Sequence, residues 1–186
     1  MEAVFVLGCE VKVVDPERRE VPRGATGELA IRGANIMKGY WNKPAETAAV
    51  LADGWYYSGD GATMDDEGFV YIVDRLKDMI ISGGENVYSA EVENAISLLA
   101  EVGEVAVIGV PDERWGERVH AIIVPKAGAN LTEEQVMTHC RNHIAGYKCP
   151  RSIDFHESPL PLSGAGKILK RELREPYWKD RDKAVN

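Results

Sequence analysis

The sequence is poor in cysteine and has no long apolar run. Its three cysteines, Cys9, Cys140 and Cys149, share no short spacing, so they predict neither a disulfide framework nor a zinc site. No stretch approaches the roughly 20 apolar residues that a membrane-spanning helix needs. Residues 1–7 have no basic leader and too short an apolar run for a signal peptide. We therefore expect a cytoplasmic protein with no integral membrane contact.

Positive charge is also scarce. The 186 residues include 22 Lys and Arg against 30 Asp and Glu, a net charge of −8. Binding of nucleic acid requires a basic face, so this balance argues against such a partner. Residues 141–186 have 10 basic against 6 acidic residues, which leaves 12 against 24 for residues 1–140. The basic end is either a solubilising helical end or a site for a phosphorylated ligand.

Residues 1–76 show strands and turns with few helices. A β-branched run at 11–14, an alternating segment at 27–33 and an apolar segment at 69–73 predict strands. Pro44 begins a helical turn, a position that proline tolerates. Several strands with few helices are typical of part of a β-barrel, so we expect an incomplete domain here.

Residues 77–186 alternate strands with helices. Apolar runs at 79–81, 105–110, 119–124 and 152–155 predict strands. Ser89 is expected to cap one helix, and Thr132 with Gln135 forms a capping box for the next. Pro176 is expected to end a third helix at 168–175. The expected fold class is therefore α/β (α+β), a partial β-barrel subdomain followed by a small α/β domain.

Four short clusters contain residues that can do chemistry. Asp60 follows a glycine, as in many plain turns, and Arg75 lies fifteen residues later. A carboxylate and a guanidinium on neighbouring strand ends can clasp two ribose hydroxyls, or form a surface ion pair. Gly83 and Gly84 permit close approach of a ligand, or simply make a hairpin turn. Lys167, on a glycine-rich loop, can reach a developing negative charge, or be an ordinary surface lysine.

The order of these clusters resembles the adenylate-forming superfamily of acyl-CoA synthetases, nonribosomal peptide adenylation domains and beetle luciferases. The resemblance covers almost the whole chain. The matching segments are Gly27-Glu28-Leu29, Gly39-Tyr40-Trp41-Asn42-Lys43-Pro44 with Glu46-Thr47, Tyr57-Ser58-Gly59-Asp60, Asp74-Arg75-Leu76-Lys77-Asp78, Ser82-Gly83-Gly84-Glu85-Asn86-Val87-Tyr88 with Glu91-Val92-Glu93, and Gly166-Lys167.

The resemblance implies a two-step reaction. ATP and a carboxylic acid give an acyl-adenylate and pyrophosphate, and coenzyme A then gives a thioester and AMP. Asp60 and Arg75 would hold the ribose hydroxyls of ATP and AMP. Lys77 would be the hinge about which a C-terminal domain rotates between the two steps. Lys167 would bridge the carboxylate and the α-phosphate during adenylation, which offsets the repulsion between the two anions.

The resemblance also implies contacts with coenzyme A. After rotation, Gly83 and Gly84 would line the channel for the pantetheine arm. Trp115 would pack near the thiol, although a core position is the alternative for this residue. Lys148 and Arg151 fall where members of the family often contact the nucleotide phosphates of coenzyme A. These contacts would explain the basic end of the chain.

Domain boundaries follow from the same resemblance. Residues 1–76 would be the C-terminal, β-rich piece of the large AMP-binding domain, and residues 77–186 would be the C-terminal lid domain. The family's phosphate loop, its acyl pocket and the block that helps bind adenine and Mg²⁺ do not occur in this sequence. We therefore expect Mg²⁺ in the parent enzyme but no metal ligand here. We also expect that the chain needs a missing N-terminal domain and cannot form an adenylate alone.

Three readings of the resemblance remain open. An acyl-CoA ligase for an aliphatic or aromatic acid is favoured by residues 79–86, which resemble fatty-acid and benzoate-type ligases. An amino-acid adenylation domain of a peptide synthetase usually shows a Gln-Val-Lys-x-Arg-Gly pattern in this loop, and this chain lacks it. A non-catalytic binding module is the third reading. Luciferase chemistry is more distant, because no residue here selects oxygenation over thiolation.

Overall fold

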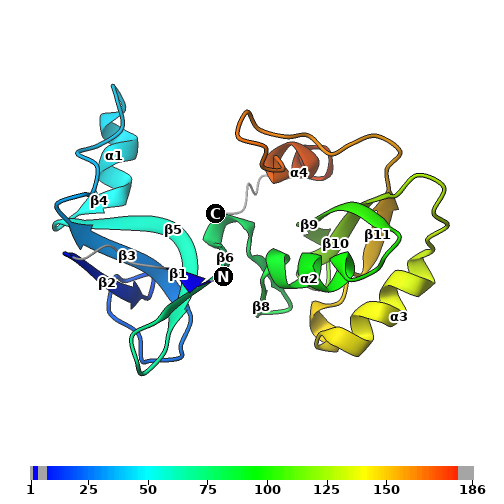
Figure 1. The fold of residues 1–186 in the computed structure, drawn as a ribbon, viewed down its shortest axis with the longest axis horizontal. Coiled ribbons are helices and arrows are strands. Elements are labelled where there is room, and N and C mark those ends of the chain that lie inside the picture. The colour runs from blue at the N-terminus through cyan, green and yellow to red at the C-terminus, as the bar shows by residue number, and fades with distance from the viewer. Residues whose placement is uncertain (1, 4–7, 180–186) are drawn as a thin grey trace. The chain divides into compact units, whose positions relative to one another are not determined.

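The chain divides into two compact units, residues 1–76 and residues 77–186. The computed structural model describes residues 2–3 and 8–179. Each unit has a β-sheet of its own (Figure 1).

The first unit is an antiparallel sheet with one short helix. Its strands follow the order β1-β6-β5-β3-β2, and β4 pairs with β5. The strands are β1 (Glu2–Ala3), β2 (Cys9–Val14), β3 (Gly27–Gly33), β4 (Leu51–Ala52), β5 (Trp55–Met64) and β6 (Val70–Arg75), and the helix is α1 (Pro44–Val50). The predicted strands at 11–14, 27–33 and 69–73 and the helical start at Pro44 are confirmed.

Both faces of this sheet contain apolar side chains. Successive residues of a strand point to opposite faces, so Val13 and Val14 on β2 join different clusters. Val13 packs with Leu29 and Met64, whereas Val14 packs with Tyr57. The ten-residue strand β5 was not predicted, because its segment of glycines and polar residues is typical of a turn. Pairing with strands on both sides stabilises it nonetheless.

The second unit is a mixed sheet with helices on its two faces. The sheet has the order β11-β10-β7-β8, with β9 also paired to β10, and only the β10–β11 pair is parallel. Its elements are η1 (Leu76–Asp78), β7 (Ile80–Ser82), β8 (Glu85–Val87), α2 (Ser89–Ser97), β9 (Val102–Asp112), β10 (Gly116–Pro125), α3 (Glu133–His143), η2 (Gly146–Lys148), β11 (Ser152–Phe155) and α4 (Lys170–Trp178). The predicted strands and the fold class, a partial barrel followed by a small α/β domain, are confirmed.

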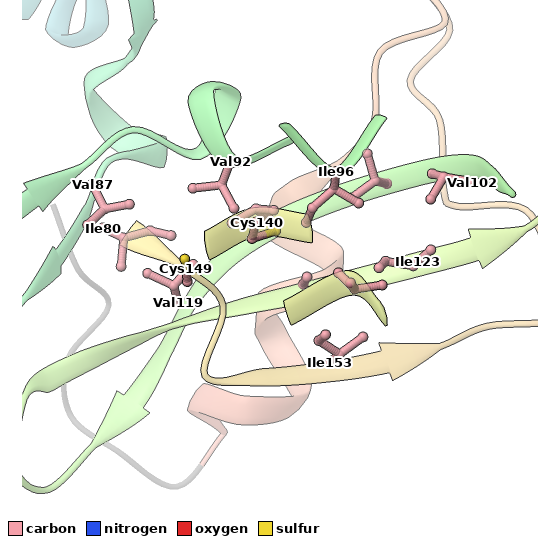
Figure 2. Close-up of a cluster of buried hydrophobic side chains, with 14 residues drawn as sticks. Ile80, Val87, Val92, Ile96, Val102, Val119, Ile123, Cys140, Cys149 and Ile153 are labelled. Atoms are coloured by element: carbon pink, nitrogen blue, oxygen red, sulfur yellow. The ribbon is translucent and has the colours of Figure 1, made fainter. Parts of the chain in front are cut away.

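Strands β9 and β10 are buried on both faces. On one face, Val107 and Ile123 pack under α2 and α3, which contribute Ile96 and Cys140. Figure 2 shows Ile96, Ile123 and Cys140 in this cluster. On the other face, Ile108 packs in a second cluster with α4. A strand that is covered on both faces has a continuous apolar sequence, which explains the uninterrupted runs at 105–110 and 119–124.

Two details of the helices differ from the expectations. Tyr88, not Ser89, is the N-cap of α2, and Ser89 is a fully buried first helical residue. Its hydroxyl accepts a hydrogen bond from Lys170 Nζ at 2.6 Å, so it serves a tertiary contact. Helix α4 continues through Pro176 to Trp178. The capping box of Thr132 and Gln135 is present as predicted.

Hydrogen bonds hold the last turn of α4 despite its proline. Pro176 removes the N–H that would bond the carbonyl of residue 172. The next two residues make tertiary bonds instead: Tyr177 Oη donates to Asp154 Oδ2 at 2.6 Å, and Trp178 Nε1 donates to the Gly109 carbonyl at 3.2 Å. These contacts keep the turn against the sheet and explain why Pro176 does not end the helix.

A buried histidine connects α4 to strands β10 and β11. Tyr177 donates its only hydroxyl proton to Asp154, so its oxygen accepts from His120 Nε2–H at 3.0 Å. His120 Nδ1 then accepts from the Ser152 hydroxyl at 2.8 Å. His120 is 2% exposed, and burial lowers the pKa of its imidazole. Asp154 raises that pKa, whereas Arg118 and His156 lower it, and burial has the largest effect.

No helix in the described residues is long and apolar enough to cross a bilayer. The longest of them, α3, has 11 residues, about half the length that a bilayer requires.

The lowered pKa of His120 predicts a loss of stability in acid. The unfolded chain binds a proton near pH 6.5, whereas the folded chain resists it until lower pH. The contribution of His120 is therefore complete above about pH 6.5 and is lost progressively as the pH falls below that value. For one proton, the free energy of unfolding changes by at most about 1.4 kcal/mol per pH unit. Urea denaturation between pH 5 and 8 measures it.

Substitution separates this effect from other titrating groups. His120→Gln should flatten the acid slope of the unfolding free energy, because glutamine does not titrate. His143→Gln, at an exposed histidine of α3, is the control for the replacement of a histidine by glutamine. An unchanged slope in His120→Gln would contradict the assignment.

Candidate functional site

Asp60 and Arg75 lie opposite each other on paired strands of the first unit. They are Cα partners in the β5–β6 ladder, and Arg75 Nε lies 2.7 Å from Asp60 Oδ1. The side chains are 28% exposed for Asp60 and 51% for Arg75, so the pair is open to solvent. The structure thus brings the predicted carboxylate and guanidinium together. They form an ion pair with remaining acceptor and donor capacity for two hydroxyls.

A local distortion of β5 orients Asp60. Gly59 has φ +73°, a conformation that favours glycine, and its N–H donates to Glu28 Oε1 at 2.9 Å. The Ser58 hydroxyl donates to the Leu29 carbonyl at 2.8 Å and accepts from the Asp60 N–H at 3.1 Å. The register of β3 and β5 shifts at this place, as at a β-bulge. The bulge fixes the backbone from which Asp60 projects.

Two tyrosines accompany the pair. Burial raises the pKa of Tyr56, and its hydrogen bond with Tyr40 and the charge of Asp60 raise it further. The phenol of Tyr56 therefore stays neutral near the Asp60 carboxylate at physiological pH. Tyr40 itself is 41% exposed. Neither tyrosine was predicted as part of a site. Tyr56 lies in strand β5, where aromatic residues usually pack against neighbours, and Tyr40 lies outside the helices and strands.

Lys77 is the first residue of the second unit and lies in the 3₁₀ turn η1. Its side chain is exposed. Its carbonyl oxygen accepts a hydrogen bond from Arg174 Nη1 at 2.9 Å. The residue predicted as a hinge is therefore attached through its backbone to α4.

Lys167 follows a closed turn. The Ser163 N–H donates to the Lys167 carbonyl at 2.7 Å, and the Gly166 N–H donates to the Ser163 carbonyl at 2.8 Å. The Lys167 N–H also donates to the Ser163 hydroxyl at 3.1 Å, and Gly166 has φ +74°. The Lys167 side chain is exposed, and no described residue forms an ion pair or a hydrogen bond with its ammonium. An ordered backbone thus presents a free cation.

Lys170 attaches the segment after this turn to α2. Its ammonium lies 2.7 Å from Glu93 Oε1 and donates to Ser89 Oγ at 2.6 Å. Glu93 also accepts the Val107 N–H at 2.7 Å, so the contact continues into strand β9. Sequence reasoning missed this pair, because no local spacing relates residues that lie 81 positions apart.

Gly83 and Gly84 form a two-residue hairpin turn against Trp115. Ser82 pairs with Glu85, and both glycines have positive φ, +65° and +87°, as a type I′ turn requires. The Gly83 N–H donates to the Trp115 carbonyl at 2.8 Å. A Cβ atom on Gly83 would lie 2.6 Å from Trp115 Cε3, whereas one on Gly84 would meet nothing within 4 Å. The indole therefore packs on the turn.

Guanidinium groups flank this indole. The Arg114 and Arg151 guanidinium carbons lie 4.7 and 4.6 Å from the Trp115 ring centroid, within the range of cation–π contacts. Asp112 accepts the N–H groups of Trp115 and Arg114, each at 3.0 Å, and the bond from Trp115 is the main cause that lowers the pKa of Asp112. Gly83, Trp115 and Arg151 thus form one cluster, and their contact with coenzyme A stays a prediction.

Lys148 is engaged elsewhere. Its ammonium lies 2.7 Å from both carboxylate oxygens of Glu91, and this bond raises the pKa of the Lys148 ammonium. It also lies 5.7 Å from the centroid of the Tyr147 ring. A phosphate at Lys148 would therefore compete with an existing ion pair, whereas Arg114, which was not predicted, already lies beside Trp115. No group of three His, Cys, Asp or Glu among the described residues is placed to hold a metal ion.

Alanine at Gly83 should destabilise the hairpin more than alanine at Gly84. Each substitution places a side chain at positive φ, which costs roughly 1–2 kcal/mol. Only Gly83→Ala also forces a methyl group into Trp115, and overpacking of this kind costs about 1–3 kcal/mol. Hydrogen exchange of β7 and β8 should show this difference. Equal losses in the two variants would contradict the contact.

Family models match two parts of the chain. The model of the AMP-binding enzyme matches residues 3–41, and the model of the AMP-binding enzyme C-terminal domain matches residues 91–167. The second match includes Trp115, Lys148, Arg151 and Lys167.

Relatives of known function extend the match to almost the whole chain. A feruloyl-CoA synthase of Amycolatopsis sp. is 49% identical over 90% of this chain and 34% of its own length. A long-chain-fatty-acid–CoA ligase of Yersinia pestis is 49% identical over 91% of this chain and 30% of its own. The crystal structure of ATP-bound MatB from Rhodopseudomonas palustris matches with a TM-score of 0.83 and 39% identity, over 93% of this chain and 34% of that one.

The chain thus spans about a third of the length of the curated relatives it matches. Its sequence, its fold and its two family matches agree with one another. The chain belongs to the AMP-binding, or adenylate-forming, enzymes and corresponds to their C-terminal region.

Proposed function

We propose that this chain is the C-terminal part of an ATP-dependent acyl-CoA ligase, an acid–thiol ligase that activates a carboxylic acid as its acyl-adenylate. The free ammonium of Lys167 on a closed turn is the observation that carries the proposal. Similarity to feruloyl-CoA and long-chain-fatty-acid–CoA ligases supports coenzyme A as the acceptor. The feruloyl-CoA and long-chain-fatty-acid–CoA ligases favour this function over a peptide-synthetase domain or a non-catalytic module.

Asp60 and Arg75 are proposed to hold the ribose of ATP and AMP. The carboxylate accepts hydrogen bonds from the ribose hydroxyls, and the guanidinium donates to their oxygens. Their solvent exposure and their existing 2.7 Å contact support this role, because a ligand can join the pair without unfolding the strands. The MatB relative was solved with ATP bound.

Lys167 is proposed to act in the first half-reaction. A carboxylate oxygen attacks the α-phosphate, and pyrophosphate leaves. The two reacting groups are anions, so an ammonium between them offsets their repulsion and stabilises charge in the transition state. Lysine suits this task as a compact cation on a long, flexible stem. The turn of Ser163 and Gly166 supplies a fixed base for that stem.

The cluster around Trp115 is proposed to act in the second half-reaction. The thiolate of coenzyme A attacks the acyl carbonyl, a thioester forms and AMP leaves. Gly83 and Gly84, which have no side chains, would line the path of the pantetheine arm, and Trp115 would pack against it. Arg151, with Arg114 beside it, would meet the nucleotide phosphates. Lys148 would join them only if its bond to Glu91 opens.

The two compact units are proposed to be the end of the large AMP-binding domain and the lid domain, with Lys77 as the hinge between them. Mg²⁺ is expected with ATP in the longer protein, and this chain supplies no ligand cluster for it among the described residues. A cytoplasmic location remains our proposal, and three free thiols are consistent with a reducing compartment.

By itself the chain should not catalyse acid-dependent exchange between ATP and pyrophosphate. The family's phosphate loop and acyl pocket are absent from its sequence. The exchange should appear when the chain is part of a protein of the full length of its relatives. Exchange by the isolated chain would contradict the division of the site.

Lys167→Ala should separate the two half-reactions in that longer protein. Loss of one electrostatic contact in a transition state costs about 10²–10³ in rate, so adenylation should fall by that factor. Thioester formation from a supplied acyl-adenylate should stay within a few-fold of the parent rate. Pyrophosphate release and thioester yield measure the two steps, and Lys179→Ala is the control at another exposed lysine. Equal loss in both steps would contradict the assigned role.

A further inference from the structure

Arg174 connects the proposed hinge to helix α4. Its Nη1 donates to the carbonyl oxygen of Lys77 at 2.9 Å, across 97 positions of sequence. Both residues line a cavity of about 550 Å³ within the second unit, together with Lys170 and Trp178. Lys77 is the first residue of that unit. The contact therefore lies at the place where the second unit begins.

The Lys77 carbonyl lies on the side of the hinge bonds that moves with the second unit. It belongs to the rigid peptide group that joins Lys77 to Asp78, and so lies on the C-terminal side of the φ and ψ bonds of Lys77. Rotation about these two bonds moves the carbonyl together with the second unit. The bond to Arg174 can consequently persist at every rotation angle.

We propose that Arg174 is a positioning residue that confines hinge bending to φ and ψ of Lys77. By holding the Lys77–Asp78 peptide group against α4, it prevents bending of the chain beyond the hinge. The second unit then turns as one rigid body and places Lys167 at a defined position. This consequence for catalysis depends on the proposed function, whereas the contact itself does not.

Helix α4 is attached firmly enough to transmit the rotation. Lys170 is bonded to Glu93 and Ser89, Leu173 is buried in the core, and Tyr177 and Trp178 are bonded to the sheet. Lys167 lies three residues before the helix, and the Leu169 N–H donates to the Pro161 carbonyl at 2.8 Å. Helix α4 therefore connects the Lys77 carbonyl, which Arg174 holds, to the turn of Ser163 and Lys167 that precedes the helix.

The energetics favour a positioning role over a stabilising one. Arg174 Nε is buried and has no hydrogen-bond acceptor among the described residues. Leaving a charged group's donor buried and unsatisfied costs free energy comparable to the gain from a hydrogen bond. The cost at Nε thus offsets the gain at Nη1. Replacing the guanidinium by an apolar side chain of similar length should leave the stability of the fold nearly unchanged.

The contact can be tested in this chain by trypsin, which cuts after Lys77. Arg174→Met retains the apolar stem and frees the Lys77 carbonyl, so the rate of appearance of fragment 1–77 should rise about tenfold. Arg171→Met, at an exposed arginine of the same helix, should cut at the parent rate. Arg174→Lys should restore protection, because lysine can donate to the carbonyl. An unchanged rate in Arg174→Met overturns the anchor.

The consequence for catalysis is tested in the longer protein. Arg174→Met should lower kcat for the complete reaction about tenfold, with KM for ATP and for the acid within about twofold and an unchanged melting temperature. Arg174→Lys should recover most of kcat, and Arg171→Met should match the parent. A lowered melting temperature, or a loss confined to KM, overturns the positioning role. Absence of ligase activity in the parent overturns the proposed function, while the trypsin result still decides whether Arg174 anchors the hinge.

Discussion

The antiparallel pair β9–β10 is buried on both faces, and the second unit depends on it. Alternate side chains of the two strands pack under α2 and α3 on one face and under α4 on the other. This arrangement excludes water from both faces and leaves the strand ends and connecting turns as the places where polar chemistry can occur. The cluster of Gly83, Trp115 and Arg151 lies at one end of the pair, where Gly116 of β10 meets Ser82 of β7.

Helix α4 shows how a polar network can add precision to an apolar contact. Leu173 and the Tyr177 ring hold the helix on the sheet by apolar packing, but apolar packing by itself does not define rotation or sliding of the helix. The bonds of Lys170, Tyr177 and Trp178 do so, because each joins a fixed donor to a fixed acceptor. His120 adds a group whose charge is disfavoured by burial, which makes this attachment sensitive to acid. These contacts also fix the position of the turn of Ser163 and Lys167, which directly precedes the helix.

The first unit positions its candidate site residues, Asp60 and Arg75, by strand pairing. Asp60 and Arg75 lie on strands that pair along their length, so their distance follows from β-ladder geometry. The bulge at Gly59 then adjusts the direction of the carboxylate. An exposed ion pair of this kind contributes little to stability. The role proposed for the pair, holding a ribose, therefore does not depend on a contribution to folding.

Local patterns in the sequence determined much of this protein. Apolar runs predicted the strands at 105–110 and 119–124, the capping box at Thr132 predicted α3, and the order of short motifs indicated the family. These features depend on neighbours within a few residues, where spacing and side-chain type decide the conformation.

Tertiary structure alone decided the rest. Strand β5 forms because strands on both sides pair with it. Helix α4 continues past Pro176 because Tyr177 and Trp178 donate hydrogen bonds to distant acceptors. Arg174 donates a hydrogen bond to the Lys77 carbonyl, which lies 97 positions away in the sequence. No local pattern encodes such pairings, because they exist only after the chain has folded and brought distant residues within hydrogen-bonding distance.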